Sequence, residues 1–265
     1  MTQRPSTRLA VVGAGTMGAG IAQVFAVAGV PTSIYDPAGP ARASVRSRVA
    51  AGCRSVGGDP AAVDALLAVP DTLAEACRDA TLVIEAVLED LSAKRAVFAE
   101  LESVVGPRTV LASNTSAIPI GRIADGLADP TRVLGTHFWH PPYLVPLVEV
   151  VQAPQTATAV VTATIEVLAA VGLRPVHVTA DVPGFIGNRL QHALKREAIA
   201  IVAGGVATAE SVDTVVREGF GRRLGLVGPL EQADLGAKTG RGFYTWAPGE
   251  AERRRAEIAR GLAAR

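Results

Sequence analysis

The sequence predicts an α/β fold, a doubly wound and mostly parallel sheet, followed by a smaller all-α domain. Up to about residue 180, short β-rich runs alternate with longer helical patterns, and this alternation is typical of βαβ units in a parallel sheet. A glycine-rich turn directly follows the first run. After Pro183-Gly184 the alternation stops and long helix-like stretches replace it. We therefore expect two domains, residues 1–181 and residues 182–265.

The expected elements follow from apolar runs and from the residues that end them. The first helical pattern ends at Gly29, a common helix stop, and the second β-rich run ends at Asp36. The expected strands cover residues 9–12, 32–35, 81–84, 109–112, 132–138, 147–151 and 174–179. The expected helices cover residues 16–28, 41–56, 60–68, 91–105, 156–171, 185–203, 209–218 and 250–265.

Composition excludes several classes of protein. The 265 residues include 26 Lys and Arg against 25 Asp and Glu, a net charge of +1, so the chain lacks the broad basic face of a nucleic-acid-binding protein. Its two cysteines, Cys53 and Cys77, form no disulfide framework, which favours a cytoplasmic protein. The sequence also lacks three or more ligands at metal-binding spacing, so we predict no metal site.

One uncharged segment, residues 9–30, is long enough to cross a membrane. Five glycines and Gln23 interrupt it, and the first three of these glycines fit a different motif. We therefore expect no membrane segment here.

That motif is Gly13-Ala14-Gly15-Thr16-Met17-Gly18, a G-x-G-x-x-G between a β-rich run and a helical pattern. In a Rossmann-type domain the first glycine makes the tight turn, the second lets the backbone approach a pyrophosphate, and the third allows close helix–strand packing. The N–H groups at the helix start attract phosphates. Asp36 ends the second run, where its carboxylate accepts from ribose hydroxyls and repels a 2′-phosphate. The motif predicts NAD as the cofactor, held by Gly13, Gly15, Thr16, Met17, Gly18 and Asp36.

A histidine and a glutamate are candidates for catalysis beside this cofactor. His137 ends one β-like run, and Glu149 lies twelve residues later inside the next. Adjacent strands joined by the turn Pro141-Pro142-Tyr143 would bring the two side chains together. A carboxylate that fixes the tautomer of a histidine makes it a general base for an alcohol. The same pairing also serves purely structural roles, and the two residues alone leave both interpretations open.

Six ordered motifs resemble the 3-hydroxyacyl-CoA dehydrogenase family over nearly the full length of the chain. They lie at residues 12–23, at 83–90 with Lys94, at 113–116, at 137–141 with 147–149, at 183–190 and at 238–244. The resemblance implies hydride transfer between C3 of an (S)-3-hydroxyacyl-CoA, as in fatty acid metabolism, and NAD. It also implies a homodimer formed through the C-terminal domain.

The resemblance assigns roles to individual residues. His137 is the general base and acid, Glu149 orients its ring, and Ser116 and Asn188 hydrogen-bond the substrate oxygen. Glu89, Lys94 and Lys238 match family positions near the nicotinamide half of the cofactor. Without the resemblance, a second interpretation is equally consistent with the sequence: Glu89 and Lys94 form a surface ion pair on a helix, and Lys238 is a solvated lysine.

Three departures from the family pattern bear on the substrate. His140 replaces the usual asparagine, which could alter substrate preference. Residues 141–147 and 219–230 are more similar to the L-gulonate 3-dehydrogenase and lambda-crystallin branch, whose members oxidise small CoA-free 3-hydroxy acids. In that case Arg222 or Arg223 would bind a carboxylate, whereas CoA would use Arg42 and Arg46. The C-terminal domain is also shorter than the family pattern. Relatives continue for several helical turns between the segment that ends at Gly236 and the motif that begins at Lys238, whereas here a single residue separates the two.

Two further alternatives stay open. The β-hydroxyacid dehydrogenase group shares the cofactor motif but relies on a catalytic lysine. The helix expected over residues 185–203 carries Asn188 and Lys195 but lacks the glycine-rich substrate turn of that group. A dinucleotide-binding protein without enzymatic activity could also retain this fold, although the set Ser116, His137, Glu149 and Asn188 argues against it.

Overall fold

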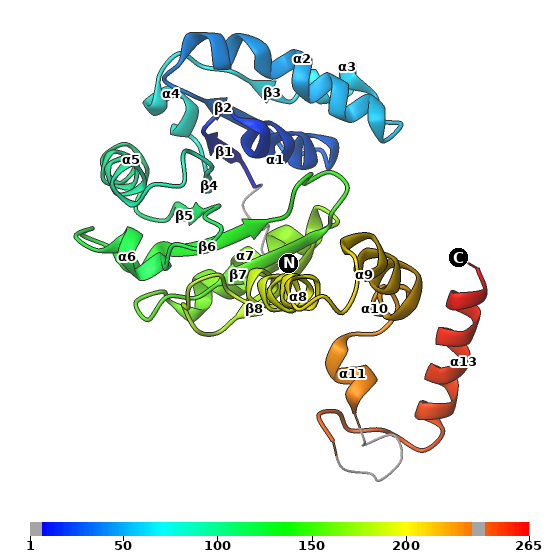
Figure 1. Ribbon diagram of the computed structural model, residues 1–265. Coiled ribbons are helices and arrows are strands. Elements are labelled where there is room, and N and C mark those ends of the chain that lie inside the picture. Colours follow the sequence, from blue (N-terminus) through cyan, green and yellow to red (C-terminus); the bar gives the residue numbers. More distant parts are fainter. Residues whose placement is uncertain (1–6, 235–241, 265) are drawn as a thin grey trace. The chain divides into compact units, whose positions relative to one another are not determined.

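The computed structural model describes residues 7–234 and 242–264, and within them one eight-stranded sheet carries the first part of the chain (Figure 1). The strand order is β3-β2-β1-β4-β5-β6-β7-β8. β7 runs antiparallel to β6, and all other neighbours are parallel. The strands are β1 (Leu9–Val12), β2 (Thr32–Tyr35), β3 (Leu67–Ala68), β4 (Leu82–Glu85), β5 (Val110–Ser113), β6 (Val133–Phe138), β7 (Leu147–Val151) and β8 (Arg174–Val178).

Helices cover both faces of this sheet. They are α1 (Thr16–Val27), α2 (Gly39–Ser55), α3 (Pro60–Asp64), α4 (Leu73–Cys77), α5 (Leu91–Val104), α6 (Ile120–Ala124), the 3-10 turn Pro130–Arg132 and α7 (Thr158–Ala170). Alternate residues of β1 enter different cores: Leu9 and Val11 pack in the core that includes α1 and α2, and Ala10 and Val12 in the core that includes α5 and α6. Because both faces are buried, the strand is almost uninterruptedly apolar. The predicted doubly wound fold is confirmed.

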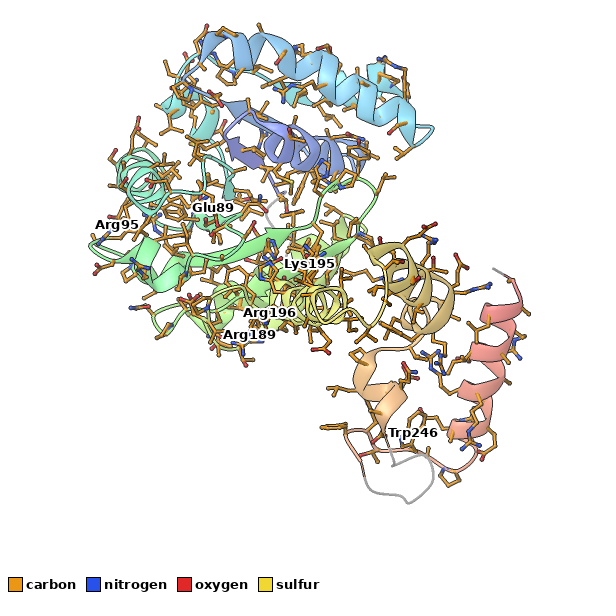
Figure 2. All side chains as sticks on the ribbon, viewed as in Figure 1. Glu89, Arg95, Arg189, Lys195, Arg196 and Trp246 are labelled. Carbon is orange, nitrogen blue, oxygen red and sulfur yellow. The ribbon has the colours of Figure 1, made fainter. Side chains whose placement is uncertain are left out.

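The chain forms two compact units, residues 1–190 and 191–265. Helix α8 (Gly187–Ala203) begins in the first unit and continues into the second, which also contains α9 (Ala209–Val215), a π-helical turn (Val216–Phe220), α10 (Gly221–Leu224), α11 (Pro229–Ala233) and α13 (Glu250–Ala263). Within the second unit Arg254 pairs with Glu231 and donates to the Leu226 carbonyl. The indole of Trp246, labelled in Figure 2, donates to Asp234 at 2.7 Å.

Two expected helices differ from the structure. The helix expected over residues 60–68 ends at Asp64, and Leu67–Ala68 instead pairs with β2 as a strand. Leu67 is buried at this sheet edge, so tertiary pairing overrides the local helical tendency. The helix expected over residues 209–218 ends at Val215, and Gly219 in the following π-turn has non-helical torsions.

Among the described residues, no helix combines the length and the apolar character that a membrane span requires.

Candidate active site

The glycine-rich turn connects β1 to α1, and each of its glycines meets a different steric demand. Gly13 has φ +106°, and a Cβ there would lie 2.5 Å from the Ala86 carbonyl oxygen. A Cβ on Gly18 would lie 1.8 Å from the Gly13 carbonyl oxygen. Around Gly15, by contrast, no described atom lies within 4 Å of the Cβ position. The first and third glycines therefore permit packing, and the second leaves space next to the backbone.

A cleft of about 550 Å³ opens beside this turn, and its lining includes Gly13, Gly15, Thr16, Met17 and Asp36. The carboxylate of Asp36 accepts from the N–H groups of Ala14 at 2.8 Å and Ala38 at 2.9 Å. It is thereby fixed at the end of β2, where a dinucleotide places its adenosine ribose. The open backbone at Gly15, the start of α1 and this carboxylate together fit NAD.

His137 and Glu149 form the centre of the candidate catalytic site. They lie opposite each other in the antiparallel pairing of β6 and β7, as the sequence predicted, and His137 Nδ1 is 2.7 Å from Glu149 Oε2. The other oxygen, Oε1, accepts from the backbone N–H groups of Ile186 at 2.9 Å and Gly187 at 3.0 Å. Burial tends to raise the pKa of Glu149, but these hydrogen bonds outweigh it and hold the pKa below its ordinary value. The glutamate is thus an anion that orients the imidazole.

Aromatic rings enclose the imidazole. The ring centroids of Trp139 and Phe185 lie 5.4 Å and 5.7 Å from that of His137. Phe185 has φ +49°, a conformation that non-glycine residues rarely adopt, and its ring is buried. Gly187 allows α8 to approach Trp139, because a Cβ there would lie 2.3 Å from the indole carbon Cζ2. These contacts fix the start of α8 beside His137.

Ser116 and Asn188 also lie together. The Asn188 side chain donates from Nδ2 to the Ser116 carbonyl oxygen at 2.8 Å. Asn114, two residues before Ser116, accepts from the Phe138 N–H at 2.9 Å and so ties this turn to the end of β6. The four predicted catalytic residues therefore belong to one connected set of contacts, all within the first unit.

Sequence comparison identifies the family. The profile of the 3-hydroxyacyl-CoA dehydrogenase NAD binding domain matches residues 8–182, and that of the C-terminal domain of the same family matches residues 184–237. The chain belongs to the 3-hydroxyacyl-CoA dehydrogenase family. It is an NAD-dependent oxidoreductase of that family, and the predicted family resemblance, enzyme class and cofactor are confirmed.

Relatives in this family act on different substrates. An L-carnitine dehydrogenase of Streptomyces griseus is 39% identical over 226 residues, which cover 84% of this chain and 68% of the relative. A 3-hydroxybutyryl-CoA dehydrogenase of Mycobacterium tuberculosis is 37% identical over 282 aligned positions, which cover 90% of this chain and 98% of the relative. The crystal structure of a 5-formyl-3-hydroxy-2-methylpyridine 4-carboxylic acid 5-dehydrogenase has a TM-score of 0.79 and 30% identity, and the match covers 98% of this chain and 97% of that one.

The two family positions Glu89 and Lys94 lie in a charged cluster at the start of α5. Figure 2 labels Glu89, in the segment between β4 and α5. Lys94 Nζ lies 2.7 Å from Glu85 Oε1 and 3.4 Å from Glu89 Oε2. Sequence reasoning did not single out Glu85, although a lone charge at the end of an apolar run was a usable signal. Lys238, the third such position, lies outside the described residues.

The residues predicted to recognise the substrate do not form a connected set of contacts like that of the four predicted catalytic residues. Arg42 donates to Asp71 at 3.1 Å and to the Asp36 carbonyl oxygen at 2.6 Å, and Arg46 pairs with Asp64. His140 is exposed after the end of β6. The remaining two predicted residues, Arg222 and Arg223, lie in α10 of the second unit. Among the described residues no group of three or more potential ligands could hold a metal ion.

Proposed function

We propose that the protein interconverts an (S)-3-hydroxyacyl-CoA and the corresponding 3-oxoacyl-CoA, with His137 as general base and acid. The observation that carries this proposal is the 2.7 Å contact between His137 Nδ1 and the buried Glu149 carboxylate. With Nδ1–H donated to Glu149, Nε2 is the nitrogen left to exchange a proton with substrate. The family membership supports the same reaction class.

The glycine-rich turn and Asp36 would hold NAD, which would supply the acceptor for the hydride on C3 of the substrate. In the oxidative direction the C3 hydroxyl gives its proton to His137 Nε2, and Glu149 stabilises the resulting imidazolium. Ser116 and Asn188 would hydrogen-bond the substrate oxygen and orient it toward His137. In reduction the same proton returns from His137 to the oxygen.

A small CoA-free 3-hydroxy acid is the second candidate substrate. Arg42 and Arg46, the cations expected to meet CoA, are engaged with Asp71 and Asp64. A relative that is an L-carnitine dehydrogenase covers 84% of this chain, which supports the same alternative. In that case Arg222 or Arg223 would bind the free carboxylate, and His140 would contribute to substrate preference.

One set of assays separates these proposals. NADH oxidation with acetoacetyl-CoA is followed at the NADH absorbance band, beside NAD reduction with L-gulonate and with L-carnitine, and His137→Ala serves as the blank. Thioester turnover that vanishes in the variant supports the CoA substrate. Turnover of the free acids alone supports the second candidate. No turnover with NAD still bound, or full activity of His137→Ala, would overturn the proposed function.

We also propose that the protein is a cytoplasmic homodimer that associates through its helical unit. Large apolar side chains are exposed there, among them Ile199 at 69% and Val215 at 64%, and such surfaces commonly mark association. Light scattering coupled to size-exclusion chromatography tests the assembly, and a monomer at micromolar concentration would contradict it.

A further inference from the structure

A buried lysine lies between two carboxylates beside the candidate site. Lys94 projects from the first turn of α5, and its side chain is only 1% exposed. Glu85, at the end of β4, is fully buried, whereas the Glu89 side chain is 42% exposed. The lysine ammonium therefore pairs with both carboxylates, at 2.7 Å from Glu85 Oε1 and 3.4 Å from Glu89 Oε2.

Each carboxylate also binds the turn that contains Ser116. Ser113 donates its hydroxyl to Glu85 Oε2 at 2.6 Å. Glu89 Oε1 accepts three hydrogen bonds: from the Thr115 hydroxyl at 2.6 Å, from the Ser116 N–H at 2.8 Å and from the Ala117 N–H at 3.1 Å. Glu85 therefore holds the start of the segment of residues 113–117, and Glu89 holds its end.

The charges in this cluster depend on one another. Glu85 and Glu89 both lie within 3.4 Å of Lys94 Nζ, and two carboxylates that share one cation repel each other. Burial of an unpaired charge is also costly, so removal of one partner from a buried ion pair is strongly unfavourable. Lys94 supplies the compensating charge to both. Burial tends to raise the pKa of Glu89, but the hydrogen bond from Thr115, the charge of Lys94 and the backbone N–H groups together hold it below its ordinary value. The cluster thus keeps Glu89 as the acceptor that the turn requires.

We infer that Glu85 is a positioning residue, which sets the place of Ser116 through Ser113 and, by way of Lys94, through Glu89. This inference rests on the proposed function, because it assumes that Ser116 contacts the substrate oxygen. The physical reason is that hydrogen bonds to a reacting oxygen are effective only when their donors are held in place beforehand.

The test is a double-mutant cycle with Glu85→Gln and Ser116→Ala, measured with whichever substrate the wild type turns over. We expect Glu85→Gln to lower kcat about tenfold while the Kd for NADH, from fluorescence titration, stays within about twofold. In the Ser116→Ala background the same substitution should change kcat by less than about twofold, because the positioned group is already gone. Ser113→Ala, which removes the hydroxyl that donates to Glu85 Oε2, provides a second variant with the same expected pattern if Glu85→Gln folds poorly.

Glu102→Gln is the matched control. Glu102 likewise accepts from the backbone N–H groups of a turn, those of Ala128 and Asp129 at 2.9 Å, and it lies 3.9 Å from Arg132. Its variant should leave kcat unchanged.

Equal losses of kcat in both Ser116 backgrounds would overturn the inference, as would a raised Kd for NADH with kcat unchanged, since the latter marks direct cofactor contact. His137→Ala, assayed in parallel, distinguishes failure of this inference from failure of the proposed function. If it abolishes turnover while the cycle is additive, only the inference fails; if it retains turnover, the proposed function fails.

Discussion

Glu149 connects His137 to the first residues of α8. One carboxylate oxygen lies 2.7 Å from His137 Nδ1, and the other accepts from the Ile186 and Gly187 N–H groups. The same carboxylate therefore orients the proposed base and anchors the helix that carries Asn188. The position of the proposed base and that of Asn188, the proposed donor to the substrate oxygen, are coupled through one side chain.

Replacement of Glu149 by glutamine should lower kcat by about 10²- to 10⁴-fold. The amide keeps the shape of the side chain but removes the charge that stabilises the imidazolium and fixes its tautomer. Steady-state kinetics with saturating NAD measure the loss. The Kd for NADH should stay within about twofold, and a variant with wild-type kcat would contradict the proposed role of Glu149.

The lowered pKa of Glu149 also predicts a pH dependence of stability. Despite the opposing effect of burial, hydrogen bonds hold this pKa below its ordinary value in the folded chain. Such a group adds stability above the unfolded-state pKa of about 4.3, and this contribution is lost as the pH falls through the folded-state pKa. The Tm difference between wild type and Glu149→Gln should therefore be full at about pH 7 and shrink below about pH 4. A difference that stays constant over this range in thermal melts would contradict the assignment.

Alanine substitutions at two glycines of the cofactor turn should have different effects: one should lower the stability of the fold, and the other should weaken NADH binding. Gly18→Ala brings a Cβ to 1.8 Å from the Gly13 carbonyl oxygen, and overpacking of this kind costs about 1–3 kcal/mol of folding free energy. Gly15→Ala meets no described atom within 4 Å, and its extended torsions suit alanine. We expect it to retain the wild-type Tm but to bind NADH about tenfold more weakly. Thermal melts and fluorescence titration check both variants, and an unaltered Kd for Gly15→Ala would show that the cofactor does not approach this backbone.

Much of the fold and of the candidate site follows from local sequence. The turn at Gly13 to Gly18 carries its structural requirement in its own residues, and alternation of strands and helices specifies a parallel sheet. The contact between His137 and Glu149 was also predictable, because two strands joined by a short proline-rich turn leave few registers that keep both faces buried.

Other parts of the site depend on packing that no local pattern encodes. The partner of Glu85 is a lysine nine residues away, and only the placement of α5 against the sheet brings them together. The backbone donors to Glu149 come from residues 37 and 38 positions further along the chain, and any residue type except proline supplies such a donor. The positive φ of Phe185 has no sequence signal, since it occurs at a residue that disfavours it.

The thiol of Cys77 should be inert in the folded protein. Burial, and secondarily the negative charge of Glu100, raise its pKa to about 12, so the reactive thiolate is scarce at about pH 8. In a Cys53→Ser variant, which leaves Cys77 as the single cysteine, a disulfide-exchange reagent should label the native protein at least about a hundredfold more slowly than the protein in guanidinium. Labelling of the native variant at the rate of a free thiol would contradict the burial of this side chain.

Asn188 should tolerate alanine better than aspartate. Its Nδ2 donates to the Ser116 carbonyl oxygen at 2.8 Å, so alanine removes a donor, whereas aspartate places a negative charge against an acceptor. We expect Asn188→Ala to lower kcat by about 10- to 100-fold and Asn188→Asp to lower it further. Arg189→Ala, at an exposed residue next along α8 and labelled in Figure 2, is the matched control and should retain activity. If the aspartate variant were the more active of the two, Asn188 would not act as a donor to this turn, and the contact with Ser116 would have no role in placing the substrate oxygen.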